Sequence, residues 1–192
     1  MKRNGFKYTI TAAILAAAFA FSGCQGAQTQ SQESSDTVTD SVMGQTVDAG
    51  EVSALCPYGW TSIGYPDTEA EDSETLLTTG LRFVKDGTVQ KDILTNVYID
   101  IRYYQSQEEI PVIDADKWYD NVADIGTMTL GTNTWEGYSA SSMGKNFVYL
   151  QTKGDGPYFT VYLYTQDSTD SAVSVNSSEV QAILKSVAVS SR

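Results

Sequence analysis

Apolar and polar positions divide the chain into three regions with different patterns. The first region begins with Lys2, Arg3 and Lys7 and continues as an apolar run over residues 10–21, with one polar interruption. A run of this length is typical of the apolar part of a secretory signal, and it is too short to cross a bilayer as a stable helix. The pattern therefore predicts a signal peptide over residues 1–23.

Polar residues predominate in the second region, residues 25–50. Ser, Thr and Gln fill half of these positions, and the region contains no aromatic residue, Lys or Arg. Such a segment buries too little apolar surface to offset the entropy that ordering would cost. We therefore expect a flexible linker with a mean reach of about 25–30 Å.

Strand periodicity dominates the third region, residues 51–192. Alternation with a period of two is clearest at residues 96–103 and 158–165, and further strands are expected at 76–84, 135–143 and 147–152. Turn residues separate these segments: Asp86-Gly87, residues 144–146 and residues 153–157. Short turns between consecutive strands favour an antiparallel meander.

Helical spacing occurs twice in the same region. Residues 115–125 are expected to form a helix that Asp114 caps and Gly126 ends, and residues 179–187 a second one. The apolar stripes that predict them are Trp118, Val122 and Ile125 in the first helix, and Val180, Ile183, Leu184 and Val187 in the second. Each helix is apolar on one side only, so we expect each to cover a sheet face. The predicted fold class is α+β, an antiparallel sheet packed by two or more helices.

The end of the predicted signal has a recognisable motif. The order Phe21-Ser22-Gly23-Cys24 resembles the lipobox of bacterial lipoproteins. This resemblance implies cleavage before Cys24, a diacylglyceryl thioether on its sulfur (with palmitate among the acyl chains) and a location at the extracytoplasmic face of the cell membrane. The predicted organisation is then a signal peptide (1–23), a lipidated Cys24 with its linker (24–50) and one domain (51–192). The alternative is an ordinary secretory signal in which Cys24 has no role.

Short motifs in the third region resemble a second family. Pro57-Tyr58-Gly59-Trp60 is similar to the P-x-G-W entry of PsbP-like domains, and residues 180–187 resemble the helix that closes them. The predicted middle helix and the strand opened by Trp135 fit the same order, so the resemblance spans about residues 52–190. It implies a sheet between helices, an α/β/α sandwich, and a binding or assembly role rather than catalysis.

Charge excludes several classes of function. The chain has 12 Lys+Arg, 24 Asp+Glu and no His, which gives a net charge of −12 and a pI near 4.2. Removal of residues 1–23 takes away three basic residues and no acid, so the side-chain charge becomes −15. Such a chain repels phosphate backbones, so nucleic acid is not an expected partner. Without His there is no His-based triad or zinc site, and we expect no metal, cofactor or catalytic residues.

Tyrosine is the most informative residue type, because the chain contains 12 of them. Tyr158, Tyr162 and Tyr164 share one side of a predicted strand, opposite Phe159, Val161 and Leu163, and Tyr149 lies on the preceding strand. We regard these four tyrosines as the candidate binding residues for an envelope protein or polymer. The alternatives are a glycan-binding role for the same residues and simple cross-strand packing under a covering helix.

Three other features have plainer interpretations. Cys56 is expected to be a buried apolar cysteine, since no His or neighbouring cation would activate it. The acidic run at residues 67–74 and the row Asp116, Asp120 and Asp124 are expected to be solvated rather than bound to Ca²⁺. Trp60, Trp118 and Trp135 are assigned to the core. The predicted function is a membrane-anchored, non-catalytic binding domain; a small hydrolase that uses unassigned carboxylates stays open as an alternative.

Overall fold

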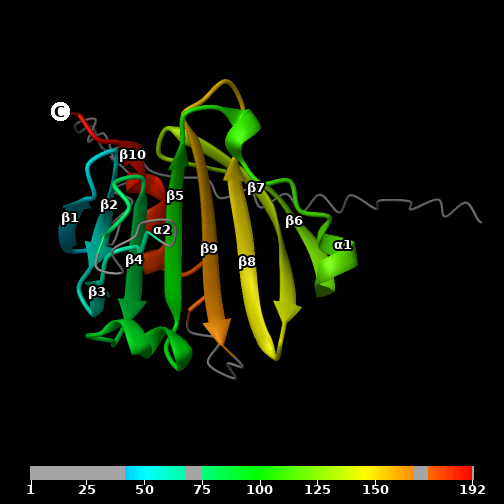
Figure 1. Cartoon of the computed structure of the whole chain (residues 1–192), viewed down its shortest axis with the longest axis horizontal. Helices are drawn as coiled ribbons and strands as arrows, with labels where there is room; N and C mark the ends of the chain where they lie inside the picture. Colours follow the sequence, from blue (N-terminus) through cyan, green and yellow to red (C-terminus); the bar gives the residue numbers. More distant parts are fainter. Residues whose placement is uncertain (1–41, 68–74, 167–172, 192) are drawn as a thin grey trace, which may run out of the picture. The chain divides into compact units, whose positions relative to one another are not determined.

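Antiparallel pairing joins the strands into two sheets (Figure 1), in a computed structural model that describes residues 42–67, 75–166 and 173–191. The smaller sheet has the order β1-β2-β10, with bounds Gly44–Asp48, Val52–Pro57 and Ala188–Val189. The larger has the order β3-β4-β5-β9-β8-β7-β6, with bounds Trp60–Ser62, Gly80–Lys85, Tyr98–Tyr104, Tyr158–Gln166, Lys145–Thr152, Asn133–Ser142 and Asp120–Leu130. The helices are α1 (Ala115–Trp118), α2 (Ser178–Ser186) and the 3₁₀ turns η1 (Gln90–Leu94) and η2 (Gln107–Glu109). The predicted α+β class is confirmed.

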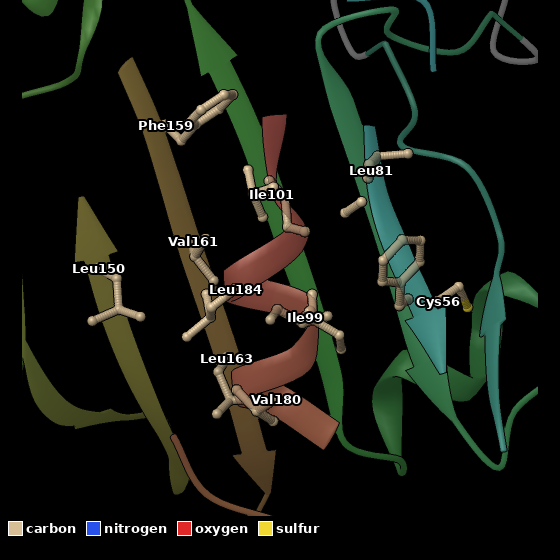
Figure 2. Close-up of a cluster of buried hydrophobic side chains, with 14 of the residues drawn as sticks. Cys56, Leu81, Ile99, Ile101, Leu150, Phe159, Val161, Leu163, Val180 and Leu184 are labelled. Atoms are coloured by element: carbon tan, nitrogen blue, oxygen red, sulfur yellow. The ribbon is translucent and has the colours of Figure 1, made fainter. Parts of the chain in front are cut away.

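The core lies between α2 and one face of the seven-stranded sheet. Ile99 and Ile101 of β5 and Phe159 and Val161 of β9 are fully buried, as the alternation of these strands predicts. Figure 2 shows their side chains on the same side of the sheet as Leu184 of α2. The helix contributes its predicted stripe to this core, and β2 closes it from the smaller sheet. One face of the larger sheet is therefore committed to packing.

Strand order departs from the predicted meander at one point. Strands β3 to β5 are neighbours in chain order, and so are β6 to β9, with the turns expected at residues 144–146 and 153–157. However, β5 pairs with β9, so the chain leaves β5 and returns at β6 on the far edge of the sheet. The connection, residues 105–119, includes η2 and α1, and we call it the crossover segment. It must pass three intervening strands, about 19 Å at ordinary strand spacing.

The helix predicted over residues 115–125 is wrong beyond its first turn. α1 ends at Trp118, and the chain continues as β6, which pairs with β7 through two register shifts. Within β6, Val122 packs on one side of the sheet and Ile125 on the other, as residues three positions apart in a strand do. The spacing of Trp118, Val122 and Ile125 fits a helix, although the last two residues lie in an interrupted strand. Trp118 is 67% exposed instead of buried, whereas Trp60 and Trp135 are in the core as predicted.

The predicted linker extends too far into the domain. Residues 44–48 form β1, an edge strand whose register with β2 runs from Gly44 opposite Pro57 to Asp48 opposite Ser53. Most side chains of β1 are exposed or half-buried, so the sequence shows no apolar alternation there. The predicted signal peptide, Cys24 and linker residues 25–41 lie outside the described residues. Within the described ranges, no helix is long and apolar enough to span a membrane.

Candidate binding face

Strand register aligns three tyrosines on the sheet face opposite α2. Tyr138 of β7 is paired with Tyr149 of β8, which is paired in turn with Tyr162 of β9. The ring centroids are 5.2 Å apart in the first pair and 4.9 Å in the second, both tilted. Cross-strand aromatic pairs of this kind stabilise a sheet and present a continuous ring surface. We call Tyr138, Tyr149 and Tyr162 the aromatic row.

Further rings extend this surface toward one end of the strands. Tyr164 is paired with Tyr98 of β5, and their rings stack with centroids 4.5 Å apart. Phe147 contacts Tyr164 at 5.7 Å and meets the ring of Tyr119 edge-on at 4.9 Å. The tyrosine face is defined here as these seven aromatic residues: Tyr98, Tyr119, Tyr138, Phe147, Tyr149, Tyr162 and Tyr164.

Polar side chains form a parallel row beside the aromatic one. The Tyr149 hydroxyl donates to Oε1 of Gln151 at 3.2 Å, and Gln151 Nε2 lies 3.4 Å from Oε1 of Glu136. Lys153 Nζ is 2.9 Å from the other oxygen of Glu136. This hydrogen bond from Lys153 lowers the pKa of Glu136 below its ordinary value. Gln151, Glu136 and Lys153, which we call the polar row, are thus held in place by one another.

The crossover segment forms a wall over these two rows and creates a groove. Because the chain must cross from β5 to β6, Gln107, residues 110–113 and Asp116 face Tyr138, Tyr149 and the polar row across a cavity of about 840 Å³. This volume is within the range of ordinary ligand sites. In the floor, Gly137 is required, since a Cβ there would collide with the carbonyl oxygen of Tyr149. Figure 1 shows the crossover segment in front of the sheet and α2 behind it.

Three of the four predicted binding residues come together. Tyr149, Tyr162 and Tyr164 belong to the tyrosine face. Tyr158 is instead paired with Tyr104 of β5 and does not belong to this cluster of rings. The cross-strand packing considered as an alternative is present, and α2 packs on the opposite face of the sheet. Sequence reasoning missed Tyr98, Tyr119, Tyr138 and Phe147. The alternation of apolar and polar residues within β5 and β7 indicates which side of the sheet Tyr98 and Tyr138 face. Which residues they pair with depends on the register between strands, which the sequence does not show.

Burial makes the tyrosines poor acids. It raises the pKa of Tyr98 and of Tyr138 to about 12, and it raises the pKa of Tyr149, Tyr162 and Tyr164 further. For Tyr98 and Tyr164 the charge of Asp100 also raises the pKa, whereas the charge of Arg82 and a hydrogen bond with Tyr164 partly lower that of Tyr98. All five hydroxyls are therefore neutral near pH 7, and each remains able to donate a hydrogen bond.

A buried ion pair supports the β4–β5 side of the face. Arg82 donates from Nε and Nη2 to the two carboxylate oxygens of Asp100, each at 2.6 Å, and both side chains are almost fully buried. The Arg82 guanidinium also lies 4.7 Å from the ring of Tyr65 and 5.6 Å from that of Tyr98. Burial lowers the pKa of Arg82, but its hydrogen bonds and attraction to Asp100 outweigh burial and raise it. Arg82 is thus a fixed cation beside the aromatic surface.

The remaining sequence candidates fall outside this face or lose their geometry. Cys56 is buried, as expected, and burial raises the pKa of its thiol. Asp120 and Asp124 are on β6 and not on a helix, so the predicted helical row with Asp116 does not exist. Most of the acidic run at residues 67–74 lies outside the described residues.

Comparisons with known proteins give no relative from which a role can be transferred. No protein-family model matches the sequence, and no curated protein matches it either. The chemistry of the tyrosine face and of the groove is therefore the basis for a functional proposal.

Two conservative substitutions should have opposite effects on the tyrosine face. The hydroxyl of Tyr138 is buried and has no hydrogen-bond partner among the residues that the structure describes, whereas that of Tyr149 donates to Gln151. Removing an unsatisfied polar atom relieves a cost, and removing a bonded one loses a contact. Tyr138→Phe is therefore expected to stabilise the protein by about 1 kcal/mol, and Tyr149→Phe to destabilise it by a similar amount. Urea unfolding of the two variants measures both changes in stability. If the two substitutions change the free energy of unfolding in the same direction, the hydrogen bonding assigned to these two hydroxyls is wrong.

Proposed function

We propose that this protein is a membrane-anchored, extracytoplasmic bacterial lipoprotein whose domain binds an envelope component without catalysis. The observation that carries the binding role is the groove of about 840 Å³ between the crossover segment and the tyrosine face. A concave site lined by aromatic rings and a few fixed polar groups is the usual form of a binding site. The anchor is proposed from the lipobox resemblance at residues 21–24.

The PsbP-like resemblance agrees with this role as part of the proposal. Its first motif, Pro57-Tyr58-Gly59-Trp60, forms the tight connection between β2 and β3, and its last motif falls on α2. Trp60 Nε1 donates to Glu179 at the start of α2, the residue just before the last motif, so the two motifs are held close together. These residues serve packing, which leaves the opposite face of the sheet available for binding.

Electrostatics favours a domain that stands away from its membrane. A mature side-chain charge of −15 is repelled by an anionic lipid surface, so the acyl chains alone would hold the protein there. In that arrangement, the groove is free to meet a component of the envelope.

The anchor has a direct test with a control inside the same chain. Cells that express the full-length protein are fed a clickable palmitate analogue, and the purified chain is examined for label. Wild type and Cys56→Ala are expected to carry the label, and Cys24→Ala to lose it, because Cys56 is buried in the folded domain. Equal labelling of Cys24→Ala and wild type would refute lipidation at this cysteine.

Binding through the groove is tested by photo-crosslinking in cells. A diazirine amino acid at Val112, fully exposed on the groove wall, is expected to capture a discrete envelope component. The same probe at Leu94, which is 66% exposed on η1, serves as the control for random collisions. Specific capture at Val112 alone supports the proposal. Identical products at both positions, or none at either, would overturn the binding role.

A further inference from the structure

We propose that the groove binds a neutral, hydroxyl-rich polysaccharide chain, an inference that rests on the proposed binding function and names its ligand class. The two rows that face the groove differ in chemistry, and their combination is the starting point. The aromatic row supplies Tyr138 and Tyr149, and the polar row supplies Gln151, Glu136 and Lys153.

Sugar rings match this combination of surfaces. A pyranose has apolar C–H faces that pack on aromatic rings and hydroxyls around its edge that both donate and accept hydrogen bonds. Gln151 provides an amide donor and acceptor, Glu136 a carboxylate acceptor and Lys153 an ammonium donor. Their mutual hydrogen bonds fix them before a ligand arrives, so binding costs little side-chain entropy.

Charge in the groove selects against anionic chains. Asp116, Asp124 and Glu136 face the cavity, and their only basic neighbour in its lining is Lys153, which is already paired with Glu136. Asp124 is close enough to Glu136 to oppose the lowering of its pKa. A uronate or phosphate polymer would meet this excess of carboxylates and the acidic domain around it. A neutral chain meets no such repulsion.

The neighbouring edge strand is poorly built to receive a peptide. An extended peptide usually adds to a free sheet edge, and the edge beside the groove is β6. Two bulges, between Asp120 and Ala123 and between Asp124 and Gly126, interrupt its ladder, and such interruptions discourage strand addition. The wall and floor are therefore better suited to a ligand held by side chains than to one held by a backbone ladder.

Native affinity electrophoresis of the full-length protein in detergent tests the ligand class. Gels contain amylose, xyloglucan, galactomannan or laminarin as neutral probes and polygalacturonate as the anionic comparator. Retardation by at least one neutral polysaccharide, without retardation by polygalacturonate, is the expected result. Retardation by polygalacturonate alone, or by none of the polysaccharides, overturns the inference.

Matched variants locate the binding. Gln151→Ala removes the central amide of the polar row and is expected to weaken the apparent affinity for the retarding polysaccharide about tenfold. Tyr58→Ala, in the turn between β2 and β3 and outside the cavity lining, is expected to leave the affinity within about twofold of wild type. Thermal unfolding checks that both variants are folded. If Gln151→Ala is not folded, Thr127→Val replaces it, because Thr127 also lines the cavity and its side chain is exposed. Retardation that neither groove substitution weakens places the sugar elsewhere and refutes the site.

The two proposals fail in different ways. If the probe at Val112 captures a protein while no neutral polysaccharide retards the chain, the binding function stands and the polysaccharide inference is wrong. If Val112 captures nothing and no polysaccharide retards the chain, both are wrong.

Discussion

Raising the pH above about 10 is expected to unfold the protein in one steep transition. In an unfolded chain each tyrosine ionises near its ordinary pKa of 10.0. In the folded domain burial raises the pKa of Tyr98 and Tyr138 to about 12 and that of Tyr149, Tyr162 and Tyr164 further. The unfolded state therefore loses protons first as the pH rises.

The sign of the effect follows from this difference. Above pH 10 the folded state binds more protons than the unfolded state, so the free energy of unfolding falls as the pH rises. Each tyrosine with a raised pKa contributes a slope of about 1.4 kcal/mol per pH unit until it ionises in the folded state as well. The five together remove several kcal/mol within about one unit, which is comparable with the whole stability of an ordinary domain. Below pH 10 their contribution is constant.

Far-ultraviolet circular dichroism and tyrosinate absorbance, recorded on the same samples, measure the transition. The two signals are expected to change together, because ionisation of the clustered tyrosines requires unfolding. Tyr162→Phe should move the midpoint to higher pH, while Tyr58→Phe, whose ring is 62% exposed, should leave it in place. If all tyrosines ionise gradually while the dichroism spectrum stays unchanged, burial does not raise the pKa of the tyrosines in the folded domain, and the prediction is wrong.

Strands with one buried face and one open face were predictable from the sequence. In β5 and β9, Ile99 and Ile101, and Phe159 and Val161, alternate with more polar residues. This alternation directly indicates which side of each strand faces the core. The spacing in α2 is equally clear, because its stripe packs on that face. In these elements the local pattern and the tertiary environment agree.

Bulges and edge positions weaken the same signal. In β6 two register shifts interrupt the alternation, and the spacing of Val122 and Ile125, whose side chains face opposite sides of the sheet, also fits a helix. Gly126, expected to end that helix, has a φ of 74° at one of the register shifts. In β1 almost every side chain is solvated, so no apolar pattern arises. Neither element can be recognised without its pairing partner.

The groove depends on information that is not local. Alternation places Tyr149, Tyr162 and Tyr164 on one side of their strands, but the aromatic row also requires the register of β7, β8 and β9. Its wall requires β5 to pair with β9, so that the crossover segment passes over the face. Strand order is set by the balance of distant contacts, which a single sequence does not display.

Replacing Asp100 with alanine is expected to destabilise the protein by about 3–5 kcal/mol. The carboxylate accepts two hydrogen bonds from Arg82 at 2.6 Å, and the two side chains are only 8% and 11% exposed. The pair itself adds little net stability, because desolvation of both ions opposes their attraction. Loss of the anion alone leaves the guanidinium buried without a counter-charge, and this is the source of the large effect. Urea unfolding at neutral pH measures it.

Two further variants separate this cause from general damage to the sheet. Arg82→Met combined with Asp100→Leu removes both charges while keeping side-chain volume, and it is expected to recover most of the lost stability. Glu136→Ala breaks an ion pair in which Lys153 is 57% and Glu136 35% exposed, so it should cost no more than about 1 kcal/mol. If the double variant is as unstable as Asp100→Ala, the loss comes from packing rather than from an uncompensated charge. Recovery of stability would instead mean that Arg82 has a role other than stabilising the fold. Its contacts with the rings of Tyr65 and Tyr98 make a role at the tyrosine face the natural explanation.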